Sequence, residues 1–133
     1  MIAIDTSVAV GAFASWHERH DVARRIVDRD VRLVGHCAVE TFSVLTRLPP
    51  PHRVESGVVR DWLVQRFAGR FLVLSAVEHR RFVSALPEHG VSGGAAYDAL
   101  VAATAWAAGV ALATLDRRAR VVYERYGLEI VGG

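Results

Sequence analysis

Four acidic residues occupy positions in this sequence at which a carboxylate needs an explanation. Asp5 and Asp116 each come at the end of an apolar segment. Asp98 stands near the start of an alanine-rich segment that is almost uncharged, and Glu40 lies inside another mostly apolar segment. Burying an unpaired carboxylate is unfavourable, so such groups are usually matched by a cation or a metal. If the fold brings the four together, they form an oxygen-rich site for a hard divalent ion.

Asp5 and Asp116 also have an ordinary structural explanation. Each precedes a segment with helical periodicity, and aspartate is a preferred N-cap residue. Thr6 or Ser7 can cap the first helix instead, which would free Asp5 for other work. Thr114 lies two residues before Asp116 and adds a hydroxyl group to the same end of the segment. For both acids the cap and the ligand remain open alternatives.

The two acids inside predicted helices differ in how strongly they indicate function. The residues three and four positions after Asp98 are Val101 and Ala102, so no cation on its own helix can pair with it. Its position in a first helical turn is also favourable beside the positive end of the helix dipole. Glu40 is expected on the margin of a buried stripe, where a solvated glutamate is the ordinary alternative. That stripe is predicted to consist of Val39, Phe42 and Leu45.

Composition indicates a folded chain and excludes several classes of enzyme. With 133 residues, 52% of them apolar, we expect a single globular domain over 1–133. The net charge is only +2, but four of the 14 acids belong to the candidate site, so the remaining surface is basic. All 16 basic residues are arginine. The lack of lysine excludes phosphate loops, phosphoaspartate receivers and haloacid-dehalogenase sites.

The cysteine content and the hydropathy pattern indicate a cytoplasmic location. Cys37 is the one cysteine, so no internal disulfide can form, and its neighbours indicate a small buried side chain. The N-terminus has no basic region before its apolar stretch, so no signal peptide is expected. Residues 99–115 carry no charge, but Gly109 interrupts them. A buried helix followed by a buried strand explains this run better than a membrane span does.

Hydrophobic periodicity predicts short strands separated by helices. Strands are expected at 1–4, 31–34, 71–74, 110–114 and 128–131. Helices are expected at about 6–13, 18–29, 37–48, 54–68, 76–86, 96–108 and 117–126, with Val58, Trp62 and Leu63 facing inward in the fourth. Such an order predicts an α/β fold with a mainly parallel central sheet and helices on both faces. Sites in such sheets form beyond the carboxyl ends of the strands, which is where Asp5 and Asp116 would lie.

The four acidic segments resemble those of PIN domains in order and spacing, over the whole length of the chain. The segments are 1–7, ending in Asp-Thr-Ser, 38–42 with Glu40, 97–103 with Asp98, and 113–116, ending in Asp116. No single motif is specific, but all four in this order are. The chain is similar to ribonuclease toxins of the VapC type, which belong to bacterial toxin–antitoxin pairs.

The resemblance implies an endoribonuclease dependent on Mg²⁺ or Mn²⁺ with a three-layer α/β/α fold. Carried over by position, Asp5, Glu40, Asp98 and Asp116 become the catalytic acids, and all of them except Glu40 become metal ligands. A cognate antitoxin, an RNA substrate and a homodimer are implied in the same way. Some relatives carry a further acid in the turn after the fourth one. Here that turn contains arginines.

Three residues around the fourth acid are candidates for binding RNA. Thr114 matches a hydroxyl residue near the site of the family, and Arg117 and Arg118 follow Asp116 directly. Guanidinium groups bind phosphates well, although a solvated start of a helix explains these arginines equally.

Two other functions remain open on the sequence. One is a binding module whose acidic pocket captures an arginine from a partner protein, with weak catalysis or none. The other is a metal nuclease acting on DNA flaps, which the short chain makes less favourable because it has no room for added clamp elements.

Overall fold

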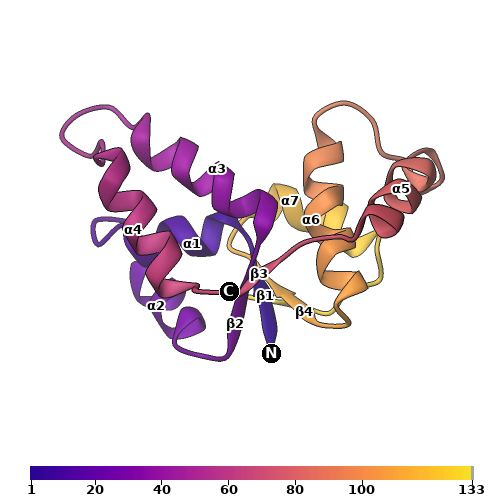
Figure 1. Cartoon of the computed structure of the whole chain (residues 1–133), viewed down its shortest axis with the longest axis horizontal. Coiled ribbons are helices and arrows are strands. Elements are labelled where there is room, and N and C mark those ends of the chain that lie inside the picture. The colour runs from indigo at the N-terminus through magenta and orange to yellow at the C-terminus, as the bar shows by residue number, and fades with distance from the viewer. Residues whose placement is uncertain (133) are drawn as a thin grey trace.

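The computed structural model describes residues 1–132, in which a central sheet lies between two groups of helices (Figure 1). The strands are β1 (Ile2–Ile4), β2 (Val31–Val34), β3 (Phe71–Leu72), β4 (Ala111–Ala113) and β5 (Ile130–Val131). The helices are α1 (Thr6–Phe13), α2 (His20–Val27), α3 (Gly35–Thr46), α4 (Ser56–Arg66), α5 (Ala76–Ala85), α6 (Ala95–Ala107) and α7 (Arg117–Glu124), with a short 3₁₀ helix η1 (Pro87–His89).

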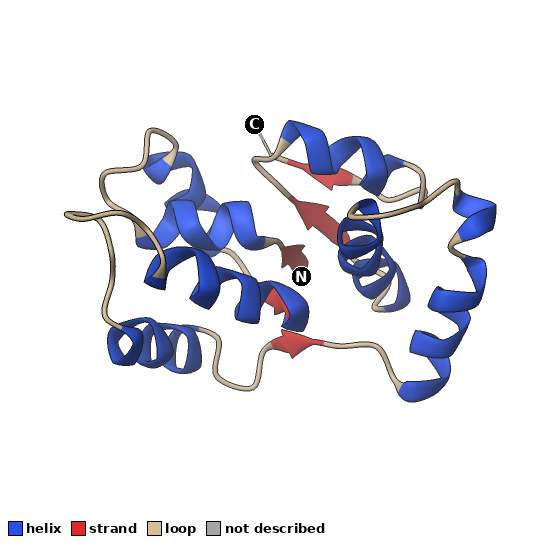
Figure 2. Cartoon of the chain, turned by 90° about the horizontal axis from the view of Figure 1, so that it is seen from above, coloured by secondary structure: helices blue, strands red, loops and turns tan. Residues whose placement is uncertain are grey.

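The sheet is parallel throughout, with the strand order β3-β2-β1-β4-β5. Helices α1 to α4 lie on one side of it and α5 to α7 on the other (Figure 2). The chain therefore adds strands in one direction from β1, returns, and adds β4 and β5 in the other direction. The order reverses between β1 and β4, and in open α/β sheets this is where a crevice forms. The predicted three-layer α/β/α arrangement is confirmed.

The core is built from small and branched apolar side chains on both faces of β1. Ile4, Leu33 and Leu112, from three neighbouring strands, are fully buried. A strand covered on both faces requires a continuous apolar run, which is the pattern that 1–4 and 110–113 show. The helix before β4 ends as the sequence predicts. Gly109 has a φ of +70° and lets Val110 donate to the Ala105 carbonyl at 3.2 Å.

Two predicted packing patterns are wrong in part. In α4, Leu63 is buried and Trp62 packs against the core as predicted, but Val58 is exposed and Val59 is buried in its place. In α3, Leu45 is buried as predicted, but Val39 is 71% exposed and Phe42 is 37% exposed, and Cys37, Ala38 and Thr41 are buried instead. The reason in α3 is that the helix begins at Gly35, directly after β2, so that its N-terminal turn fixes which face meets the sheet. Within residues 1–132 no helix is both long enough and apolar enough to cross a bilayer.

Candidate metal centre

The four predicted acids line one small pocket. Asp5, Glu40, Asp98 and Asp116 surround a polar cavity of about 30 Å³, which is room for a water molecule or an ion. Asp5 follows β1 and Asp116 follows β4, so they come from the two strands between which the sheet order reverses. Glu40 enters from α3, on one side of the sheet, and Asp98 from the first turn of α6, on the other.

Asp5 is the most deeply buried member of the site, with 3% of its surface exposed. Its Oδ1 accepts hydrogen bonds from the Ser7 hydroxyl at 2.6 Å and from the Val8 backbone N–H at 3.3 Å. Its Oδ2 accepts from Thr114 at 2.6 Å and from Tyr123 at 2.9 Å. A carboxylate has about four acceptor positions, so these donors fill it.

Burial and hydrogen bonding have opposite effects on the pKa of Asp5. Burial raises the pKa of its carboxyl group above the ordinary range, and the four hydrogen bonds partly oppose that rise. The bond from Val8 also makes Asp5 the N-cap of α1. Of the capping residues that the sequence left open, Asp5 is therefore the cap, and Thr6 and Ser7 are not. Ser7 instead donates its hydroxyl to Asp5 and accepts the Leu115 backbone N–H at 2.8 Å.

Asp98 carries the clearest electrostatic signature of a shared site. Partial burial raises the pKa of its carboxyl group, and the negative charges of Asp116, Glu40 and Asp5 raise it further. The Arg118 guanidinium opposes this effect. Like charges disfavour the ionised form, so the other three carboxylates of the pocket act on the pKa of Asp98. A bound cation would relieve that repulsion.

Asp116 and Glu40 stand at the more exposed side of the pocket. Asp116 is the N-cap of α7, where its Oδ1 accepts the backbone N–H groups of Arg118 at 2.9 Å and Ala119 at 3.1 Å. The side chain of Glu40 is 47% exposed, and its Oε2 lies 3.8 Å from His36 Nε2. Glu40 is thus on the margin of α3, as predicted, although the stripe beside it is a different one.

The hydroxyl groups around Asp5 include residues that the sequence analysis did not select. Tyr123 lies two turns into α7 and is 2% exposed, and nothing in its sequence context distinguishes it from a core tyrosine. Thr114 was predicted to bind substrate, but it is 4% exposed and its hydroxyl donates to Asp5 while accepting the Asp116 backbone N–H at 3.0 Å. This corrects the assignment, because a side chain so enclosed positions Asp5 and does not reach a polymer.

A larger groove of mixed charge adjoins the pocket. It has a volume of about 530 Å³ and shares Thr6, Ser7, Glu40 and Asp116 with the acidic site. Its other charged or titratable lining residues are His17, Glu18, Arg19 and Arg117. Arg118 acts on the pocket through its charge, whereas Arg120 pairs with Glu124 at 3.0 Å along α7. Of the three arginines that follow Asp116, the first two therefore face the site.

The carboxylates of the pocket are chemically suited to a hard divalent cation, but in this structure they are not close enough together to bind one ion jointly. Carboxylate oxygens are the ligands that Mg²⁺ and Mn²⁺ prefer. Within residues 1–132, Asp5, Asp98 and Asp116 form no ion pair with an arginine that would compensate their charge. In the same range no three His, Cys, Asp or Glu side chains are already close enough to hold one metal ion. Asp5 is saturated by its donors, so ligation requires rotation of the exposed acids and release of at least one donor.

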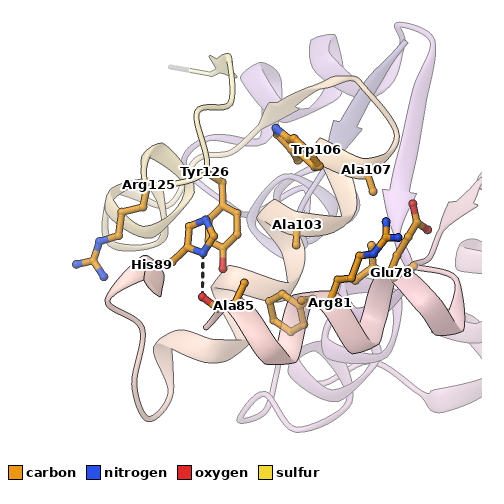
Figure 3. A pocket seen from close by; sticks show the side chains of 11 residues that line it. Glu78, Arg81, Ala85, His89, Ala103, Trp106, Ala107, Arg125 and Tyr126 are labelled. Carbon is orange, nitrogen blue, oxygen red and sulfur yellow. Dashed lines mark hydrogen bonds between the residues drawn. The ribbon is translucent and has the colours of Figure 1, made fainter. Parts of the chain in front are cut away.

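A second cavity lies away from the acids, between α5, α6 and α7 (Figure 3). It encloses about 390 Å³ and is lined mainly by apolar atoms. On its wall His89 stacks on Tyr126, with ring centroids 4.2 Å apart, and His89 Nδ1 lies 3.1 Å from the Ala85 carbonyl oxygen. Glu78, Arg81 and Arg125 lie at its edge. Its lining has no cluster of carboxylates and shares no residue with the lining of the acidic pocket.

Comparison with known proteins relates the whole chain to one family. The model of the PIN domain family matches residues 2–125. The chain is 52% identical over 130 residues to ribonuclease VapC40 of Mycobacterium tuberculosis, covering 98% of this chain and 97% of that protein. It is 40% identical over 132 residues to ribonuclease VapC27 of the same species, covering 98% and 95%. Among solved structures, FitAB bound to the IR36 DNA fragment contains a chain that superposes with a TM-score of 0.72 at 21% identity, covering 99% of this chain and 94% of that one.

Proposed function

Because this chain belongs to the PIN-domain family, we propose that it is a metal-dependent endoribonuclease, the toxin of a toxin–antitoxin pair. The observation that carries the proposal is the meeting of Asp5, Glu40, Asp98 and Asp116 in one polar pocket at the carboxyl ends of β1 and β4. The names of the two mycobacterial relatives support RNA as the substrate.

We assign Asp5, Asp98 and Asp116 as ligands of Mg²⁺ or Mn²⁺. A divalent cation held there would polarise the phosphoryl oxygen as a Lewis acid and supply an acidified water for in-line attack. Glu40 approaches from the exposed side of the pocket, where its carboxylate can orient that water. Because water attacks in place of the ribose 2′-hydroxyl, the products carry 5′-phosphate and 3′-hydroxyl ends.

The groove next to the pocket is the proposed path of the RNA backbone. Arg117 lines this groove and Arg118 raises the local positive potential, so both can bind the phosphates that flank the cut. Asp5 is held in place by hydrogen bonds from three hydroxyl groups, those of Ser7, Thr114 and Tyr123, which therefore act on the reaction through Asp5.

Cleavage by purified protein tests the proposal directly. Wild-type protein should cut RNA with Mg²⁺ or Mn²⁺ and stop in chelator, and end-mapping should find 5′-phosphates. Asp98→Asn should abolish cleavage and leave the far-ultraviolet circular dichroism unchanged, since the Asp98 carboxylate accepts no hydrogen bond from residues 1–132 that the fold would lose. Asp21→Asn is a matched control, because Asp21 also stands in a first helical turn but is exposed and lies outside the pocket. Cleavage that survives Asp98→Asn would overturn the assignment of the site.

A second candidate function is favoured by one observation. The acids are not yet spaced for a metal, and a pocket of uncompensated carboxylates can accept a guanidinium group from a partner. We propose that the cognate antitoxin inhibits the enzyme by inserting such a guanidinium group into the pocket. We propose further that this takes place in the cytoplasm and that the active form of the enzyme is a homodimer. A chain that binds its antitoxin but cuts no RNA with either metal would reduce the function to binding alone.

A further inference from the structure

Two aromatic rings stand together at the mouth of the acidic pocket. Tyr97 and His36 both line it, and their rings are nearly parallel, with an interplanar angle of 9° and centroids 5.6 Å apart. Tyr97 directly precedes Asp98 in the first turn of α6, and His36 is the second residue of α3. The pair therefore bridges helices from the two sides of the sheet, directly beside the candidate metal ligands.

The exposure of Tyr97 does not fit a purely structural ring. Its side chain is 62% exposed, although it is large, apolar and held in a helix of very small residues. A tyrosine that served only to pack α6 against α3 would bury most of its surface, as Tyr123 does. Instead one face of the Tyr97 ring is supported by His36 and the remainder meets solvent. The ring is held in a fixed orientation and still offers area for contact.

His36 contributes a second unused feature. Its Nε2 atom is buried and has no hydrogen-bond partner among residues 1–132, and its separation of 3.8 Å from Glu40 Oε2 is longer than a hydrogen bond. An unpaired buried nitrogen is costly, so its retention at the pocket indicates a partner that arrives with a ligand. A ribose hydroxyl of the bound RNA would provide that partner.

We propose that Tyr97, backed by His36, is a stacking platform for the nucleobase next to the scissile phosphate of single-stranded RNA; this inference rests on the proposed nuclease function. Unpaired bases bind proteins by stacking on aromatic rings, and every base has a face that can do so. The adjoining groove shares four residues with the pocket but is lined by neither His36 nor Tyr97. The strand would then have its backbone bound in the groove and one base bound on the platform, with the phosphate between them over the acids.

The platform predicts a selective requirement for an unpaired base. A base within a duplex is stacked on its neighbours and cannot reach the ring, so cleavage should be confined to single-stranded segments and loops. The preference for particular bases at this position should be weak, because stacking reads the face of the base and not its edge.

Binding measurements in an uncuttable background test the platform. The probe is a short single-stranded oligoribonucleotide spanning the mapped cut, with 2-aminopurine next to the cleaved bond, and the protein carries Asp98→Asn. Binding should quench the fluorophore through stacking. Adding Tyr97→Ala should abolish the quenching and weaken binding by about 5- to 150-fold, while Tyr97→Phe should keep both. Trp106→Ala is the matched control, because it removes an exposed aromatic from the other end of α6.

A comparison with RNA lacking one base separates stacking from a structural role. An oligoribonucleotide with an abasic ribose at the same position should bind the Tyr97 protein as weakly as the full RNA binds the Tyr97→Ala protein, and Tyr97→Ala should then cost nothing further. If Tyr97→Ala weakens both RNAs equally, or weakens neither, the platform is refuted. Wild-type protein that cuts no RNA would defeat the nuclease proposal itself, which is a different result from cleavage that ignores Tyr97.

Discussion

Replacing Tyr123 with phenylalanine should destabilise the protein by an amount that can be worked out from one hydrogen bond. The Tyr123 hydroxyl is buried and donates to Asp5 Oδ2 at 2.9 Å. A hydrogen bond to a charged group contributes about 1.5–3 kcal/mol net to stability. Unfolding entropy is about 2.1 cal/mol/K per residue, or roughly 0.28 kcal/mol/K for 133 residues. The expected loss in Tm is therefore about 5–11 °C.

The effect should depend on pH in a defined direction. The bond from Tyr123 favours ionised Asp5 and so lowers its pKa, against the rise that burial causes. The difference in stability between wild type and Tyr123→Phe should be largest where Asp5 is ionised. It should shrink as the pH falls through the pKa of Asp5, because the protonated carboxyl group is a weaker acceptor. Unfolding in chelator, followed by circular dichroism at several pH values, measures this difference.

The neighbouring turn of the same chain supplies a matched control. The Tyr126 hydroxyl is buried, and within residues 1–132 it has no hydrogen-bond partner. Tyr126→Phe removes the same atom without removing a bond, so its Tm should stay at or above the wild-type value. The reasoning fails if Tyr123→Phe melts with the wild type, or if Tyr126→Phe loses as much stability as Tyr123→Phe.

Three further predictions concern the pocket and its supports. In chelator, Asp98→Asn should have a higher Tm than the wild type at about pH 8. The pKa of Asp98 is raised in the folded protein, so its ionised form opposes folding and removing the charge stabilises the fold. In acid the wild-type carboxyl group is protonated, so the difference in Tm should disappear. Mg²⁺ or Mn²⁺ should raise the Tm of the wild type and not of Asp98→Asn, and equal shifts in both would contradict the ligand assignment. Gly11→Leu should lower the free energy of unfolding by about 1–3 kcal/mol in denaturant titrations. The reason is that a Cβ at Gly11 would already lie 3.0 Å from the Ala23 Cβ where α1 meets α2. An unchanged midpoint would show that the two helices separate freely.

The parts of the fold that follow from local chemistry could be predicted from the sequence. Apolar runs ending in Asp5 and Asp116 identify strands that end at one edge, and Gly109 identifies the end of the alanine-rich helix. That topology placed Asp5 and Asp116 at one edge, whereas Glu40 and Asp98 were grouped with them by the resemblance to PIN domains. The buried face of α3 was not predicted: the helix starts two residues earlier than expected and presents Cys37 and Thr41 to the core in place of Val39 and Phe42.

The finer organisation of the site depends on contacts across more than a hundred residues of sequence. Thr114 and Tyr123 converge on Asp5 from the far end of the chain, and no local pattern records that their hydroxyl groups meet there. For the same reason Thr114 was assigned to substrate, although it is buried against Asp5. Tyr97 and His36 stack only because α3 and α6 approach each other from opposite sides of the sheet.

The strand order also determines when during synthesis the enzyme can become active. β1 is the first strand to leave the ribosome, yet it is the middle strand of the sheet and pairs on one side with β4, which begins at Ala111. Asp5 is made long before its distant neighbours in the site, because Thr114, Asp116 and Tyr123 follow it by more than a hundred residues. The pocket therefore cannot assemble until β4 and α7 have been made and have packed beside β1.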